Sequence, residues 1–149
     1  PEFLLRLLAW FIARVIYRIR VEGLELVPTQ GPALVICNHI SYADALVLSA
    51  AVPRPMRFVM EAAIFRIPVA EYVFRGMKAI PVATRAEDPA VREEAFRQVL
   101  AELERGEIVC LFPEGKLTAD GTIGEFRPGI LRILRERAVP VIPVGQLGM

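Results

Sequence analysis

The pattern that most constrains the fold is a series of short apolar runs that alternate with segments of helical periodicity. The runs are typical of buried strands and cover residues 33–37, 57–60, 78–82, 108–112 and 139–144, with a further strand-like link at 21–27. The helical segments cover residues 43–52, 61–75, 88–105 and 128–137, the second of them broken near Pro68. Strands that alternate with helices usually pair in parallel. The sequence therefore predicts an α/β domain with a largely parallel sheet flanked by helices.

The segment 88–105 carries the clearest helix signal. Asp88 is a good N-cap, Pro89 suits the first helical position, and Gly106 follows the last turn. The apolar side chains recur at helical spacing and form one face: Val91, Ala95, Phe96, Val99, Leu100 and Leu103. The charged side chains on the opposite side are expected to form a solvated face.

Composition narrows the possible classes of function. The net charge of +1 gives no indication of nucleic-acid binding. One histidine and two isolated cysteines, Cys37 and Cys110, argue against a metal site and against a disulfide framework. Hydrophobic residues make up 54% of the chain and the mean hydropathy is +0.44, which indicates a protein that lies at a membrane or forms part of a membrane protein. Because the chain opens at Pro1 and stops just after an apolar strand, we expect a fragment of a longer protein.

Residues 3–18 are apolar apart from three arginines, Arg6, Arg14 and Arg18, and small alanines. On a helix these arginines fall within about 120° of arc. The segment is too short and too rich in arginine to span a bilayer comfortably. We therefore expect an amphipathic helix in the membrane interface over residues 1–20, followed by one domain over residues 21–149. Two alternatives stay open: a helix packed on the domain's own core, and the tail of a preceding transmembrane segment.

The candidate for chemistry is His39, the single histidine of the chain. It follows the strand 33–37, and behind it Ser41 and Asp44 have the spacing of a capping box. His39 is therefore expected on a turn, with Asp44 in the first turn of a helix. On a continuous helix the two would lie about 140° apart, so the turn has to bring them together. The carboxylate would then fix the ring tautomer, as in a hydrolase dyad. The alternative is a structural histidine beside an ordinary helix cap.

A second group of candidate residues, Glu114, Gly115 and Lys116, follows the strand 108–112. In α/β folds the loops at the carboxyl ends of parallel strands form the site. We therefore expect these residues to meet His39 in one cleft. The alternative for Glu114 is a carboxylate that closes the turn beside Gly115.

Three motifs in order resemble those of the glycerophospholipid acyltransferases, the lysophosphatidic acid acyltransferase family. Asn38 and His39 with Asp44 match the family's NHxxxxD motif, residues 112–115 match its FPEG block, and residues 139–144 (VPVIPV) are similar to its fourth motif. The resemblance covers roughly residues 25–145. It implies a glycerol-phosphate-acyltransferase-like fold and a membrane-associated enzyme on the cytoplasmic face of the inner membrane.

The resemblance also implies a reaction. His39 would act as a general base, oriented by Asp44, on the free hydroxyl of a lysophospholipid. That hydroxyl would attack the thioester of acyl-CoA or acyl-carrier protein, without a metal or redox cofactor. The chain agrees with this, because neither of its serines, Ser41 and Ser49, lies in a GxSxG elbow. The alternatives are a thioesterase or lipid hydrolase, and a lipid-binding domain without catalysis.

The resemblance implies that Asn38, Arg85, Glu114, Gly115 and Lys116 bind substrate, but the chain departs from the family at the phosphate-binding positions. The usual FPEGTR reads FPEGKL here, with Lys116 and Leu117 in place of threonine and arginine. Val82 stands where the second block usually has an arginine, and Arg85 is a candidate substitute. A lysine lacks the bidentate fork of arginine. We therefore expect the phosphate of the acceptor to be bound differently, and a head-group-bearing lysophospholipid such as lysophosphatidylethanolamine to be preferred over lysophosphatidic acid. The changed block is also similar to variants in bacterial multidomain proteins.

Overall fold

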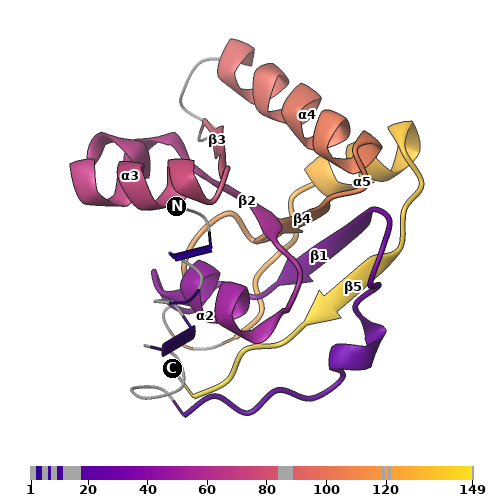
Figure 1. The fold of residues 1–149 in the computed structure, drawn as a ribbon. Coiled ribbons are helices and arrows are strands. Elements are labelled where there is room, and N and C mark those ends of the chain that lie inside the picture. The colour runs from indigo at the N-terminus through magenta and orange to yellow at the C-terminus, as the bar shows by residue number, and fades with distance from the viewer. Residues whose placement is uncertain are drawn as a thin grey trace.

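A computed structural model describes residues 3–4, 7, 10–11, 18–83, 89–118, 120 and 122–148. Within these residues the chain forms a five-stranded sheet in the order β3-β2-β4-β1-β5 (Figure 1). The strands are β1 (Ala33–Cys37), β2 (Met56–Glu61), β3 (Ile80–Val82), β4 (Ile108–Leu111) and β5 (Val141–Val144). Every neighbouring pair is parallel, so all five strands end at the same edge of the sheet. The predicted parallel α/β class is confirmed.

In the part of the chain that the structure describes, four α-helices cover the two faces of this sheet. They are α2 (Asp44–Ala51), α3 (Pro68–Gly76), α4 (Pro89–Glu104) and α5 (Gly129–Glu136). Successive side chains of a strand point to opposite faces. Along β1, Val35 belongs to the cluster that contains residues of α2 and α3, whereas Leu34 belongs to the cluster with residues of α4 and α5. The domain therefore has three layers, with apolar side chains buried on both faces of the sheet.

The predicted break at Pro68 divides the segment 61–75 into two helices of different kinds. The short 3₁₀-helix η3 (Ala62–Arg66) ends before Ile67, and α3 begins at the proline. Ile67 has an extended backbone, φ −90° and ψ 115°, as the residue before a proline prefers. Pro68 then occupies the first helical turn, where its missing N–H costs nothing.

The other boundaries agree with the sequence within a few residues, with one error. The predicted strand-like link at 21–27 is wrong, because this segment contains the 3₁₀-helix η2 (Leu24–Leu26). The helix predicted at 88–105 is observed as α4, and Gly106 ends it in the left-handed conformation with φ 83°. Asp88, its predicted N-cap, lies outside the described residues.

Only part of the predicted interfacial segment over residues 1–20 is described. Five apolar residues in it are helical and exposed: Phe3, Leu4, Leu7, Trp10 and Phe11. Arg6 and Arg14 lie outside the described residues, so the predicted arc of arginines and the interfacial helix itself stay predictions. Among the residues that the structure describes, no helix is both long enough and apolar enough to cross a bilayer.

Candidate active site

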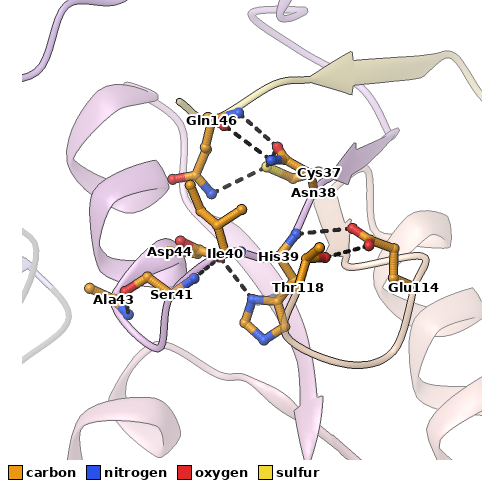
Figure 2. A network of polar contacts seen from close by, with 10 residues as sticks. All are labelled: Cys37, Asn38, His39, Ile40, Ser41, Ala43, Asp44, Glu114, Thr118 and Gln146. Atoms are coloured by element: carbon orange, nitrogen blue, oxygen red, sulfur yellow. Dashed lines mark hydrogen bonds and ion pairs between the residues drawn. The ribbon is translucent and has the colours of Figure 1, made fainter. Parts of the chain in front are cut away.

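His39 and Asp44 contact each other at the carboxyl edge of the sheet (Figure 2). The turn after β1 folds back so that Nδ1 of His39 lies 2.8 Å from Oδ2 of Asp44. A carboxylate oxygen accepts, so Nδ1 donates in this contact, and in the neutral ring the lone pair is then on Nε2. Nε2 points away from Asp44 in Figure 2, and the side chain of His39 is 21% exposed. The contact with Asp44 therefore selects the tautomer that a base needs, with Nε2 directed away from Asp44.

Three donors hold Asp44 in place. Besides His39, the backbone N–H groups of Ile40 and Ser41 donate to Oδ2 at 2.9 and 3.1 Å. The carboxylate is fully buried in the first turn of α2, where the helix dipole favours a negative charge. Its other oxygen, Oδ1, is buried and accepts no hydrogen bond within the described ranges.

The predicted capping box is present in part. The carboxylate of Asp44 accepts from the backbone of Ser41, as the box requires. The hydroxyl of Ser41 accepts instead from Ala43 N–H at 3.1 Å, one residue short of the predicted partner. The helix itself starts at Asp44 with Ala43 as its N-cap. The box geometry therefore sets the turn that carries His39, although the first helical residue lies one position later than predicted.

The ring of His39 is fixed on one face by an aromatic stack. Phe112, directly after β4, lies with its ring centroid 4.3 Å from that of His39 and an interplanar angle of 23°. Both residues line a cavity of about 510 Å³ between the sheet and the helices α4 and α5. Most of its wall is apolar, and the apolar residues from strands and helices include Val59, Val82, Val99, Leu111, Ile130 and Ile133.

Glu114 lies behind His39, with its carboxylate directed at the backbone. Oε1 accepts from His39 N–H at 3.2 Å, and Oε2 accepts from the hydroxyl of Thr118 at 2.6 Å and from Gly124 N–H at 2.8 Å. Burial alone would raise the pKa of this carboxyl, but these hydrogen bonds outweigh it and hold the pKa below the usual value. The predicted meeting of this loop with His39 is therefore observed. The predicted contact of Glu114 with substrate stays a prediction.

Gly115 and Lys116 lie on the cavity wall, together with Arg127, whose place in the sequence is equally consistent with a solvent-facing side chain. Gly115 has a left-handed backbone with φ 63°, and a Cβ on it would overlap the guanidinium of Arg127. Arg127 also donates to the carbonyl of Gly115 at 3.1 Å. The left-handed backbone is the reason that the position favours glycine, since the exposed end of the Arg127 side chain could shift to admit a Cβ. Arg85, the candidate phosphate ligand, lies outside the described residues.

Asn38 joins the site to the last strand. Its amide pairs with the backbone of Gln146 in both directions, Nδ2 to the carbonyl at 3.0 Å and Gln146 N–H to Oδ1 at 2.7 Å. These two bonds already engage both the oxygen and the nitrogen of the Asn38 amide. The predicted contact of Asn38 with substrate stays a prediction. Gln146 is a further residue that sequence reasoning missed, because a single glutamine past the last strand carries no local signal.

The cysteines are buried free thiols, as predicted. Burial raises the pKa of Cys37 to about 11, against the smaller lowering effect of a hydrogen bond from Gln146. Burial also raises the pKa of Cys110 well above its usual value. Both groups stay protonated near neutral pH, so neither is a ready nucleophile. Within the described ranges, no group of three or more His, Cys, Asp or Glu side chains is arranged to hold a metal ion.

Comparison with known proteins assigns this arrangement to a family. The sequence model of the acyltransferase family matches residues 18–146. The chain belongs to the acyltransferase family. The matched region includes the whole sheet and every residue of the His39 site described above, so the likeness is not confined to the three motifs.

Two relatives of this chain are themselves named acyltransferases. It is 29% identical over 148 residues to a chloroplastic 1-acyl-sn-glycerol-3-phosphate acyltransferase of Arabidopsis thaliana, covering 99% of this chain and 41% of that protein. It is 29% identical over 144 residues to a lyso-ornithine lipid O-acyltransferase of Pseudomonas aeruginosa, covering 93% of this chain and 52% of that protein. The chain thus spans about half the length of the curated relatives it matches.

A solved structure shares the fold. The crystal structure of PlsC, the 1-acyl-sn-glycerophosphate (LPA) acyltransferase from Thermotoga maritima, matches with a TM-score of 0.64 and 22% sequence identity. The match covers 95% of this chain and 72% of that one. The three-layer architecture is therefore that of a known acyltransferase.

The conformation of Gly115 makes a prediction about stability. Gly115→Ala should lower the free energy of unfolding by about 1–2 kcal/mol, because an L-residue is strained at this φ. Gly129→Ala is the matched control, since no atom lies within 4 Å of its would-be Cβ and it stands in a helix. The control should be neutral or stabilising by up to about 1 kcal/mol. Urea denaturation followed by circular dichroism measures both, and equal stabilities would contradict the argument.

Proposed function

We propose that this chain transfers a fatty acyl group from an acyl thioester to the free hydroxyl of a lysophospholipid. The observation that carries the proposal is the buried Asp44 carboxylate on Nδ1 of His39, with the ring on the wall of an apolar cavity. Membership of the acyltransferase family supports the reaction class. The names of the relatives support a lysolipid acceptor.

The proposed reaction needs one base and no covalent intermediate. Nε2 of His39 takes the proton of the acceptor hydroxyl as its oxygen attacks the thioester carbonyl. Asp44 stabilises the imidazolium that forms, because its carboxylate stays on Nδ1–H. The tetrahedral intermediate collapses by breaking the C–S bond, and the imidazolium returns the proton to the leaving thiolate. The products are an ester and a free thiol, which balances the reaction. Direct transfer is consistent with the raised pKa values of both cysteine thiols.

The cavity suits an amphiphilic substrate. Its apolar wall, between the sheet and helices α4 and α5, fits an acyl chain better than water. Four basic residues line the same cavity: Arg92, Lys116, Arg127 and Arg132. Arg132 is neutralised by a bidentate ion pair with Glu93, both distances being 2.8 Å. The other three outnumber the one acidic residue of the lining, Glu61, so the cavity keeps a net positive charge that favours an anionic group. Either the phosphate of the acceptor or the phosphates of a coenzyme A donor would fit; acyl-carrier protein remains the alternative donor.

One assay tests the reaction. Purified protein is incubated with acyl-CoA or acyl-carrier protein and a panel of lysophospholipids, and products are identified by mass spectrometry. We expect a diacyl product, with turnover reduced about 10²- to 10⁴-fold in His39→Ala and in Asp44→Asn. Asp120→Asn, an exposed aspartate away from the cavity, is the matched control and should keep full turnover. Free fatty acid without diacyl product would indicate a thioesterase or hydrolase, and binding without either product a lipid-binding domain.

Arg127 should contribute to recognition of the anionic group. Its guanidinium lies against Gly115 in the cavity wall, and the one side-chain hydrogen bond described for it goes to a neutral carbonyl. Arg127→Gln should raise KM for the phosphate-bearing substrate about tenfold or more, since a hydrogen bond to a charged group contributes roughly 1.5–3 kcal/mol. Arg135→Gln, an exposed arginine of α5 outside the cavity wall, is the control. KM is measured separately for acceptor and donor, and an unchanged KM for both would contradict the assignment.

We also propose that the protein works at the membrane surface, on the cytoplasmic face of the inner membrane, where it meets its acceptor. The exposed helical residues Phe3, Leu7 and Trp10 support this, as does the high mean hydropathy. Deletion of residues 1–18 leaves the family-matched region almost intact and should abolish sedimentation with anionic vesicles. Vesicles of neutral phosphatidylcholine are the control for the contribution of charge. Undiminished sedimentation of the deletion variant would contradict the proposal.

A further inference from the structure

The backbone of His39 is held on both sides by the loop that follows β4. Its N–H donates to Oε1 of Glu114 at 3.2 Å, and its carbonyl accepts from the backbone N–H of Thr118 at 2.8 Å. The hydroxyl of Thr118 in turn donates to Oε2 of Glu114 at 2.6 Å. These three residues form a closed ring of hydrogen bonds, and Figure 2 shows the two bonds that Glu114 accepts within it.

The register of the sheet brings the members of this ring together. In the pairing of β1 with β4, Ala33 faces Ile108 and Ile36 faces Leu111, an offset of 75 residues. His39 and Glu114 are separated by the same 75 residues, so the contact continues the strand register into the two loops. The side chain of Glu114 therefore links the turn that carries His39 to the end of the neighbouring strand β4.

The carboxylate of Glu114 is buried and is not part of the cavity wall. Only 3% of the residue is exposed, and its two oxygens accept from His39, Thr118 and Gly124. A Cβ on Gly124 would lie 3.0 Å from Oε2, so the loop closes tightly over the carboxylate. A substrate group could reach this carboxylate only by breaking bonds that hold the loop.

We propose that Glu114 is a positioning residue, which with Thr118 fixes the backbone of His39, and that it does not bind the acceptor. The inference rests on the proposed role of His39 as the base. Position matters because a misplacement of about 1 Å at a reacting group can lower the rate about 10²-fold. This role replaces the expected contact of Glu114 with substrate and adds Thr118 to the site.

A positioning role and a substrate-binding role for Glu114 predict different kinetic effects of its substitution. Glu114→Ala should lower kcat about 10²-fold and leave KM for the lysophospholipid within about twofold, because the substrate keeps its contacts while His39 is misplaced. Glu114→Gln should recover part of kcat, since its amide oxygen still accepts from His39 N–H. Thr118→Val should lower kcat in the same direction, and Thr118→Ser should restore it. A rise in KM of tenfold or more with kcat retained would overturn the proposal.

The single histidine allows a test that does not need activity. In the protein labelled with ¹³C,¹⁵N-histidine, the resonances of the His39 ring protons should be shifted from those of free histidine by the ring current of Phe112, whose ring stacks on the imidazole. In Glu114→Ala and Thr118→Val these resonances should move toward those of free histidine, and in Glu114→Gln much less. Glu125→Gln is the matched control, because Glu125 is an exposed carboxylate on the same segment as Gly124. Unchanged resonances in both Glu114→Ala and Thr118→Val would overturn the proposal.

The two measurements separate the possible failures. If wild-type protein makes no diacyl product but the resonances of His39 move as expected, the proposed function fails and the positioning role stands. If the wild type is active and the resonances stay fixed, the positioning role fails alone. If Glu114→Ala does not fold, Thr118→Val carries both tests, since it removes one hydroxyl and leaves no buried charge without a partner.

Discussion

The parallel register between β1 and β4 is the constraint on which the site depends. Because both strands run in the same direction, the loops that follow them leave the sheet at one edge. The offset that pairs the strands also sets His39 against Glu114 and brings Phe112 onto the imidazole ring. A slip of one residue would turn every side chain of a strand to the other face of the sheet. The burial of apolar side chains on both faces therefore stabilises the register and, through it, the geometry of the site.

Two buried carboxylates flank the histidine, and each is kept there by donors from the backbone. Asp44 accepts from two backbone N–H groups and the ring, and Glu114 accepts from two backbone N–H groups and a hydroxyl. An unpaired buried charge would cost several kcal/mol, so these bonds are needed to keep both groups in place. One carboxylate acts on the ring and the other on the main chain. His39 is thereby fixed in tautomer and in position by separate groups.

The cavity next to this polar edge joins an apolar wall to basic side chains. The wall is made by the same strand and helix faces that form the core, and the cations without a described acidic partner come from α4 and from the connection between β4 and α5. This division matches a substrate with an acyl chain and a charged head. Leu117 stands at the position of the arginine in the usual FPEGTR block, and the guanidinium of Arg127 lies directly against Gly115 of the same block. A cationic side chain from outside the motif can thus lie beside Gly115.

The sequence by itself determined the fold class, the strands and the place of His39 and Asp44, because these depend on local periodicity and on residues only five apart. The sequence also contains the family motifs that indicate the reaction class. Only the tertiary structure decided that Glu114 turns toward the backbone of His39, that Asn38 pairs with Gln146, and that Arg127 reaches Gly115. Each of these contacts joins elements far apart in the chain, and strand order and register decide which elements meet. Short apolar runs between helical segments indicate which residues form strands, but they do not encode which strand lies next to which.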